Sequence, residues 1–139
     1  MTDYLSKEQI EASLANSTFG AYMGLTIVAL DIDAQRITMH APMRPEFERR
    51  KGSGQWHGGP IAAIIDTVGD YALAMLVGQP LPTVNFRVDY LRPVVNSGIT
   101  AVGRVRRNGK SVGVVDVDIL DDQKNLAAIG RATYSTLRM

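Results

Sequence analysis

One segment constrains the fold of this chain more than any other: residues 60–77 are apolar at almost every position. A helix that is apolar on nearly every side is usually buried in a protein core. Asp66 and Asp70 interrupt the segment, which argues against a membrane-spanning helix. We therefore predict a buried central helix, with Pro60 at its first position and Gly78 at its end.

On both sides of this helix the chain shows the residue patterns of β-strands. Residues 25–32 and 37–41, joined by a turn at 31–34, predict a hairpin before it. Four strands joined as a meander are expected after it, with Asn108-Gly109 as a tight turn between the second and third. These four expected strands are 83–90, 99–107, 111–120 and 125–137.

The N-terminal residues predict a short helix over residues 6–16, with Ser6 as a candidate cap. Gly20 and Gly24 are expected to break the helical pattern after it. The simplest packing of all these elements is an α+β domain, in which one antiparallel sheet curls around the central helix. We expect residues 1–139 to form a single domain, with residues 1–18 as a helical extension.

Composition excludes several kinds of site. The chain has no cysteine, so a disulfide, a thiolate zinc site and a cysteine nucleophile are all excluded. Its two histidines, His40 and His57, are far apart in sequence, and no metal site is expected. The net charge of +1 argues against a nucleic-acid-binding polycation. The first residues lack a signal-peptide pattern, so we expect a cytoplasmic protein without membrane association.

Two carboxylates in an apolar helix are candidates for chemistry, because a buried carboxylate is costly unless it is paired or hydrogen-bonded. Asp66 and Asp70 lie one turn apart on the same helical face. Just before the helix, His57-Gly58-Gly59 precedes amides that have no intrahelical acceptor and could hold an oxyanion. The alternatives are that the carboxylates point to solvent or cap a loop, and that the glycines form an ordinary turn.

The spacing of His57-Gly58-Gly59 and Asp66 closely resembles the motif of hotdog-fold acyl-CoA thioesterases, in particular the phenylacetyl-CoA thioesterase (PaaI) branch. Residues 90–93 (Tyr-Leu-Arg-Pro) and 108–111 (Asn-Gly-Lys-Ser) resemble further motifs of this family. The resemblance implies a helix wrapped by five or six antiparallel strands, paired into homodimers and often into dimers of dimers. It also implies active sites at the dimer interface.

The resemblance implies a role for several residues. Asp66 matches the nucleophile or general base, and Gly58 matches the glycine whose amide polarises the thioester carbonyl. Thr83 matches a hydroxyl that helps to place water, and His57 matches an orienting histidine. Lys51 stands where many members have an asparagine, so Gln55 is an alternative source of an amide.

Further residues are candidates for binding the substrate. Gly59 belongs to the glycine motif, and Trp56 could line the acyl channel or simply pack in the core. Arg107 and Lys110 flank a turn and could bind the CoA phosphates, or they could be solvated surface residues, as could Arg104 and Arg106.

Acyl-CoA hydrolysis is the leading interpretation, with CoA entering as part of the substrate and no separate cofactor. A non-catalytic acyl-CoA sensor of the same fold is the alternative, since fold does not fix function. A hotdog hydratase ranks lower, because those enzymes pair an acid with a histidine and the central helix contains no histidine.

Overall fold

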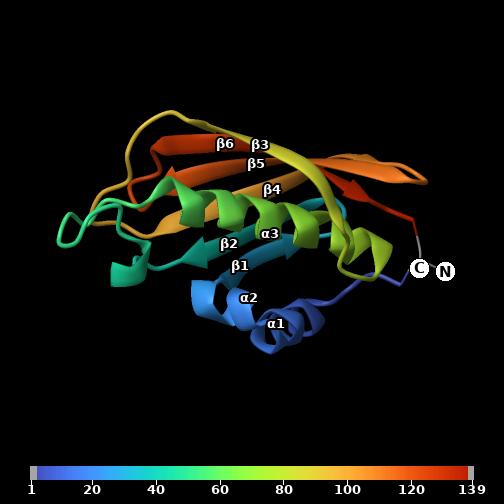
Figure 1. Cartoon of the computed structure of the whole chain (residues 1–139). Helices are drawn as coiled ribbons and strands as arrows, with labels where there is room; N and C mark the ends of the chain where they lie inside the picture. Colours follow the sequence, from blue (N-terminus) through green and yellow to red (C-terminus); the bar gives the residue numbers. More distant parts are fainter. Residues whose placement is uncertain (1–2, 138–139) are drawn as a thin grey trace.

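The computed structural model describes residues 3–137 and contains one six-stranded antiparallel sheet packed on a long helix (Figure 1). The strands lie in the order β1-β2-β4-β5-β6-β3. The elements along the chain are α1 (Lys7–Asn16), α2 (Thr18–Met23), β1 (Thr26–Asp31), β2 (Arg36–Ala41), the 3-10 turn η1 (Pro45–Phe47), α3 (Gly58–Val77), β3 (Thr83–Tyr90), β4 (Ile99–Asn108), β5 (Val112–Asp121) and β6 (Leu126–Ser135).

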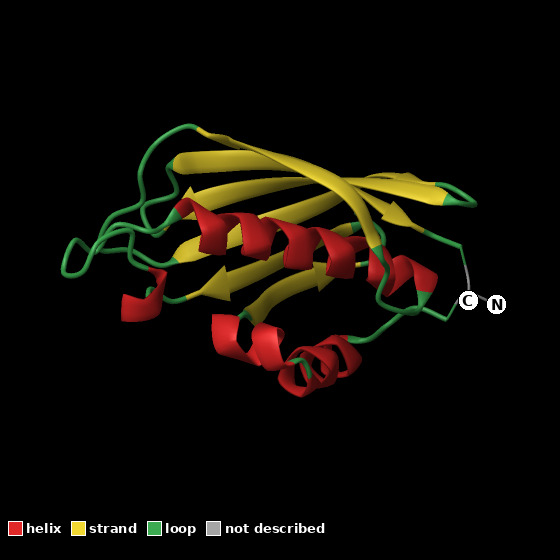
Figure 2. Ribbon diagram, viewed as in Figure 1, coloured by secondary structure: helices red, strands yellow, loops and turns green. Residues whose placement is uncertain are grey.

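Helix α3 crosses the inner face of the curved sheet, while α1 and α2 lie beyond β1 (Figure 2). By length and composition α3 could span a membrane, but 67% of its most apolar window is buried inside the protein. Close packing depends on a glycine in β6: a Cβ at Gly130 would lie 2.6 Å from Ile65 of α3. The α+β arrangement and the buried central helix are thus confirmed.

The start of α3 differs from the prediction. The helix begins at Gly58, His57 is its N-cap, and Pro60 is therefore its third residue rather than its first. A proline fits there because the amides of a first helical turn have no intrahelical acceptor in any case. The predicted end is correct, since Gly78 is the C-cap with a left-handed φ of 98°.

The predicted four-strand meander is wrong for its first strand. β4, β5 and β6 are consecutive neighbours, but β3 pairs with β6 at the far edge of the sheet. The connection after β3 runs across the end of the sheet: the amide of Leu91 donates to Ala127, and the amide of Trp56 donates to the Val94 carbonyl. These bonds hold β3 and the segment before α3 close to each other.

The N-terminal helix is confirmed, with Ser6 as N-cap in a capping box with Gln9. The prediction that Gly20 breaks the helical pattern is wrong. Gly20 lies inside α2, where its amide donates to the Ser17 side chain that caps this helix. Gly24 ends α2 in a left-handed conformation with φ of 68°.

Candidate active site

Asp66 lies in the middle of α3 and is half-buried. Thr83, the first residue of β3, donates a hydrogen bond from Oγ1 to Asp66 Oδ1 at 2.8 Å. Residues 17 positions apart in sequence are thus brought into direct contact. Because Thr83 is exposed, the carboxylate and the hydroxyl stand together at an accessible position.

The backbone of Asp66 is held by Tyr134 of β6. The Tyr134 hydroxyl donates to the Asp66 carbonyl at 2.6 Å, and the ring is fully buried. Burial, together with the nearby charges of Asp66 and Asp70, raises the pKa of Tyr134. A Cβ at Gly69 would overlap the Tyr134 hydroxyl, so a glycine is needed there. Tyr134 also pairs with Thr83 in the β3–β6 ladder, so this strand pair contacts both the side-chain carboxylate and the backbone carbonyl of Asp66.

Asp70, one turn further along α3, has a different environment. Its Oδ1 accepts a hydrogen bond from the Leu81 amide at 2.9 Å, so it caps the loop that leads to β3. Burial raises the pKa of Asp70 to about 7; the Leu81 hydrogen bond opposes this shift, and repulsion from Asp66 adds to it. Of the alternatives considered for Asp70, loop capping is therefore the one observed.

The N-terminus of α3 presents a second group of predicted site residues. His57 Nδ1 accepts from the Gly59 amide at 2.9 Å, which caps the helix. Gly58, as the first helical residue, has no intrahelical acceptor for its N–H. The Tyr90 hydroxyl donates to the Gly58 carbonyl at 2.5 Å, and a Cβ at residue 58 would lie 3.1 Å from that hydroxyl.

A pocket of about 510 Å³ opens beside this helix end and includes Gln55, Trp56, His57 and Gly58 in its wall. Trp56 is buried, stacks on Phe47 and donates from Nε1 to the Ser97 carbonyl at 2.7 Å, so its position is fixed. The remaining lining residues are Arg49, Ile61, Tyr90, Leu91, Arg92, Pro93 and Val94.

Lys51, by contrast, is exposed and does not line this pocket, whereas Gln55 does. Tyr90 is a lining residue to which the sequence analysis gave no role. Its place in the Tyr-Leu-Arg-Pro motif was the available signal. Tyr134 gave no such signal, because it follows the same alternating pattern as any other core residue of a strand.

Several predicted site residues are not brought together within one chain. Gly58 and Asp66 are eight residues apart on a continuous helix, which corresponds to about 12 Å. Neither Asp66 nor Thr83 lines the pocket beside Gly58. Arg107 and Lys110 lie at the β4–β5 turn, at the opposite end of the molecule from the start of α3 (Figure 1).

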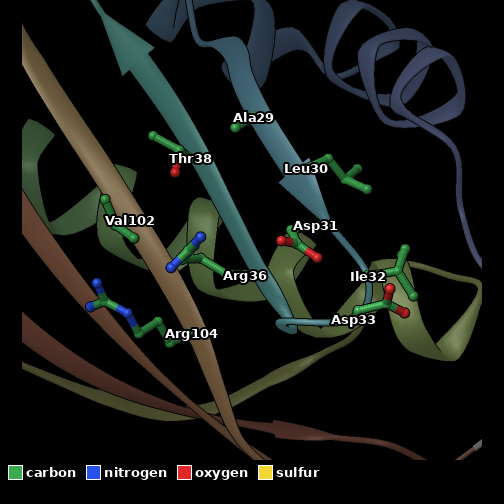
Figure 3. A pocket seen from close by; sticks show the side chains of 9 residues that line it. All are labelled: Ala29, Leu30, Asp31, Ile32, Asp33, Arg36, Thr38, Val102 and Arg104. Atoms are coloured by element: carbon green, nitrogen blue, oxygen red, sulfur yellow. The ribbon is translucent and has the colours of Figure 1, made fainter.

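A second hollow, of about 540 Å³, lies on the outer face of the sheet and is separate from these residues (Figure 3). Nine side chains from β1, β2, β4 and the β1–β2 turn line it, including Arg36 and Arg104. Arg104 forms an ion pair with Asp118 at 3.0 Å. Within residues 3–137, no group of three or more His, Asp or Glu side chains is arranged to hold a metal ion.

Comparison with known proteins extends these observations. Residues 53–128 match the family model described as Thioesterase superfamily. The acyl-coenzyme A thioesterase PaaI of Escherichia coli is 28% identical over 127 residues, which cover 89% of this chain and 86% of that protein. A solved structure described as a thioesterase-superfamily protein has a TM-score of 0.87 and 31% identity, covering 93% of this chain and 96% of that one.

A thioesterase of Haemophilus influenzae, at 22% identity, has a TM-score of 0.82 over 94% of this chain and 90% of its own. At that identity the similarity concerns the fold alone. Together with the six-stranded sheet around α3, these matches confirm the expected hotdog fold and the expected family resemblance.

Proposed function

Because this chain belongs to the thioesterase superfamily, we propose that it hydrolyses an acyl-CoA thioester to a free acid and CoA. Its similarity to an acyl-coenzyme A thioesterase along most of both chains supports this substrate class. CoA enters as part of the substrate, and the proposed reaction uses no separate cofactor. We further propose that residues 1–139 act as one domain and that the protein is cytoplasmic.

The contact between Thr83 and Asp66 carries the proposal. A carboxylate oriented by a hydroxyl at an accessible position can attack the thioester carbonyl carbon, which expels CoA thiolate and leaves an acyl–carboxylate anhydride that water then hydrolyses. Alternatively, Asp66 removes a proton from a water molecule that attacks the same carbon. In either case Thr83 orients the carboxylate or the water.

Gly58 is the proposed oxyanion donor. Its N–H lies at the start of a 20-residue helix, where the helix dipole favours negative charge, and it borders the 510 Å³ pocket. The Tyr90 hydroxyl holds the Gly58 carbonyl and thereby fixes the peptide plane that follows. His57 orients the same turn by accepting from Gly59.

The separation of about 12 Å between Gly58 and Asp66 supports a site that is shared between two chains. We propose a homodimer, with dimers pairing further, in which one subunit supplies Gly58 and the other supplies Asp66 and Thr83. β3 is an edge strand that carries exposed Val84 and Tyr90, with Leu91 exposed next to it. An unpaired edge with exposed apolar side chains is suited to pairing with a second copy.

Two experiments test this proposal. Thiol release should be measured across acyl-CoAs from short aliphatic to aryl and long-chain, and a wild-type protein inactive on all of them would refute hydrolysis. Sedimentation should show at least a dimer. An active protein that is monomeric at micromolar concentration would refute the shared site.

Subunit complementation tests the shared site directly. Gly58→Pro removes the N–H, and His57 already has the extended backbone (φ −69°, ψ 148°) that a following proline requires, although the ring also brings a Cβ to 3.1 Å from the Tyr90 hydroxyl. Gly58→Pro and Asp66→Asn should each be inactive alone. Co-expressed, they should regain roughly a quarter of wild-type activity, because about half of the two-fold dimers are mixed and each mixed dimer has one intact site. Gly58→Ala, which adds the same Cβ beside Tyr90 but keeps the N–H, is the matched control.

The exposed position of Lys51 favours one alternative, a non-catalytic acyl-CoA-binding protein. Lys51 stands where the family often has an asparagine, and it does not line the pocket. Gln55, which does line it, supports the catalytic proposal by offering an amide. Tight acyl-CoA binding without thiol release from any substrate would favour the alternative.

A further inference from the structure

Asp70 is a half-buried titratable group with no part in the proposed reaction. It lies on the same helix as Asp66, one turn further on, where a simple core position would carry an apolar residue. A carboxylate that is partly removed from water is costly unless it is paired or hydrogen-bonded. Its hydrogen bond with the Leu81 amide, at 2.9 Å, ties the C-terminal half of α3 to the segment that enters β3.

Three consecutive residues after α3 are each held by a different contact. The Leu81 amide donates to Asp70, the Pro82 carbonyl accepts from the Ser135 amide at 2.9 Å, and Thr83 Oγ1 donates to Asp66. The Leu81 side chain is itself buried. The segment is therefore fastened on both α3 and β6, and Thr83 is the residue at which it reaches Asp66.

We propose that Asp70 is a positioning residue, which by holding Leu81 fixes the Thr83 hydroxyl on the Asp66 carboxylate. This inference rests on the proposed function, because the consequence of the contact is measured in the reaction of Asp66. Asp70 does not touch the substrate in this proposal. Its effect reaches the reacting carboxylate only through residues 81–83.

The ionisation of Asp70 gives this role a measurable signature. The titratable groups close to it are Asp66 on its own helix and Tyr134 on β6. Burial raises the pKa of Asp70 to about 7, so its charge changes in the range where activity is measured. A charged acceptor makes a stronger hydrogen bond to an amide than a neutral one does. Thr83 should therefore be held better as the pH rises through about 7.

The test compares two substitutions of Asp70 in the full-length protein. Asp70→Asn keeps an oxygen acceptor for Leu81 and should retain kcat within about threefold, but the wild-type ionisation near pH 7 should vanish from its pH profile. Asp70→Ala removes the acceptor and should lower kcat by roughly tenfold, with KM changed much less, because positioning of reacting groups is lost.

A double-mutant cycle connects this effect to Thr83. Thr83→Ala should lower kcat, and adding Asp70→Ala to it should cause little further loss, because both changes break the same contact. Asp31→Ala is the matched control: Asp31 also caps a turn through a 2.9 Å bond to an amide, that of Ala34, but at the β1–β2 turn away from α3. It should leave kcat and the pH profile unchanged.

Independent, multiplying effects of Asp70→Ala and Thr83→Ala would overturn the proposal, as would an unchanged pH profile in Asp70→Asn. NMR separates this failure from failure of the proposed function. The Leu81 and Thr83 amide shifts should titrate with a midpoint of about 7 in the wild type and not in Asp70→Asn. If the wild type releases no thiol, hydrolysis is refuted, and these shifts alone decide whether Asp70 holds the segment.

Discussion

Aspartates on the two faces of the sheet have opposite surroundings. On the outer face, Asp116 accepts from Arg131 at 2.6 Å and lies 3.5 Å from Arg106, and the Arg131 hydrogen bond, followed by attraction to both arginines, lowers its pKa despite partial burial. On the helix side, Asp66 accepts from a hydroxyl and Asp70 from a backbone amide. Among residues 3–137, neither of these two forms an ion pair.

This difference separates carboxylates that are bound to a cation from those that remain available for chemistry, such as Asp66. A carboxylate bound to a guanidinium has its lone pairs engaged by a permanent cation, which weakens it as a base or nucleophile. Asp66, oriented by one neutral donor, keeps lone pairs available for a substrate or water. Negative charge alone does not identify a site, since the outer face has as clear a cluster of aspartates as the helix does.

The largest expected effect is a loss of kcat when Asp66, the candidate for chemistry in this comparison, is replaced. Asp66→Asn keeps the side-chain shape but removes the basic oxygen, so kcat should fall by roughly 100-fold or more, the range seen for acid–base groups. Steady-state thiol release is the measurement. Asp116→Asn on the outer face is the control and should keep kcat near the wild-type value.

Thermal melting and sedimentation must show that both variants remain folded oligomers. Near-wild-type kcat in Asp66→Asn would remove Asp66 from the mechanism. Equal losses in both variants would mean that the two faces do not differ in the way proposed.

A second prediction concerns stability against pH, for which Asp70 and Asp116 should act with opposite signs. The folded-state pKa of Asp70 is raised to about 7, so between pH about 4 and about 7 the native state holds a proton that the unfolded state has lost. This group should therefore lower the free energy of unfolding by up to ~1.4 kcal/mol per pH unit as the pH rises through that window. Urea unfolding across that range measures it, and Asp70→Asn should flatten the slope.

For Asp116 the folded pKa is lowered, so its contribution to stability is present above its unfolded pKa and is lost as the pH falls through the folded value. Asp116→Asn should therefore change stability mainly below pH about 4. Because the Arg131 side chain is exposed and Asp116 is only partly buried, the effect should be small, and high salt should reduce it. If Asp70→Asn and Asp116→Asn changed the pH dependence of the free energy of unfolding in the same direction, the contrast between the two faces would be contradicted.

The smallest effect is expected on KM, from replacing two basic residues that, in the described part of the chain, form no ion pair with the aspartates of the sheet. Within residues 3–137, Arg107 and Lys110 form no ion pair, unlike Arg104 and Arg131. If they bind CoA phosphates, replacing both with glutamine should raise KM by about threefold to tenfold with kcat retained, and the difference should shrink at high salt. An unchanged KM would make them ordinary surface residues.

Features that depend on local sequence pattern were predictable. The apolar helix, the capping by Ser6 and five of the strand positions follow from periodicity and turn residues, and β3 was placed correctly along the chain. Its pairing with β6 was not predictable, because antiparallel strands with the same alternation fit several sheet orders and a contact across the sheet end decides among them.

The same reasoning separates the site residues. Asp66 stood out because a charge interrupts an apolar helix, and the resemblance added Thr83, which the structure places on its carboxylate. Tyr134 could not be singled out, because its hydroxyl matters only once β6 lies beneath α3. The start of α3 at Gly58 was missed because a proline at the third helical position gives the same signal as one at the first.

The fit between Gly69 and Tyr134 restricts the order in which this chain can accumulate mutations. Gly69→Ala alone would drive a methyl group into the Tyr134 hydroxyl. After Tyr134→Phe the same methyl group would meet less obstruction, because the atom nearest to it is gone. The first change is therefore harmful or tolerable according to whether the second has already occurred. The route to an alanine at position 69 passes through a protein that has already given up its hydrogen bond to the Asp66 carbonyl.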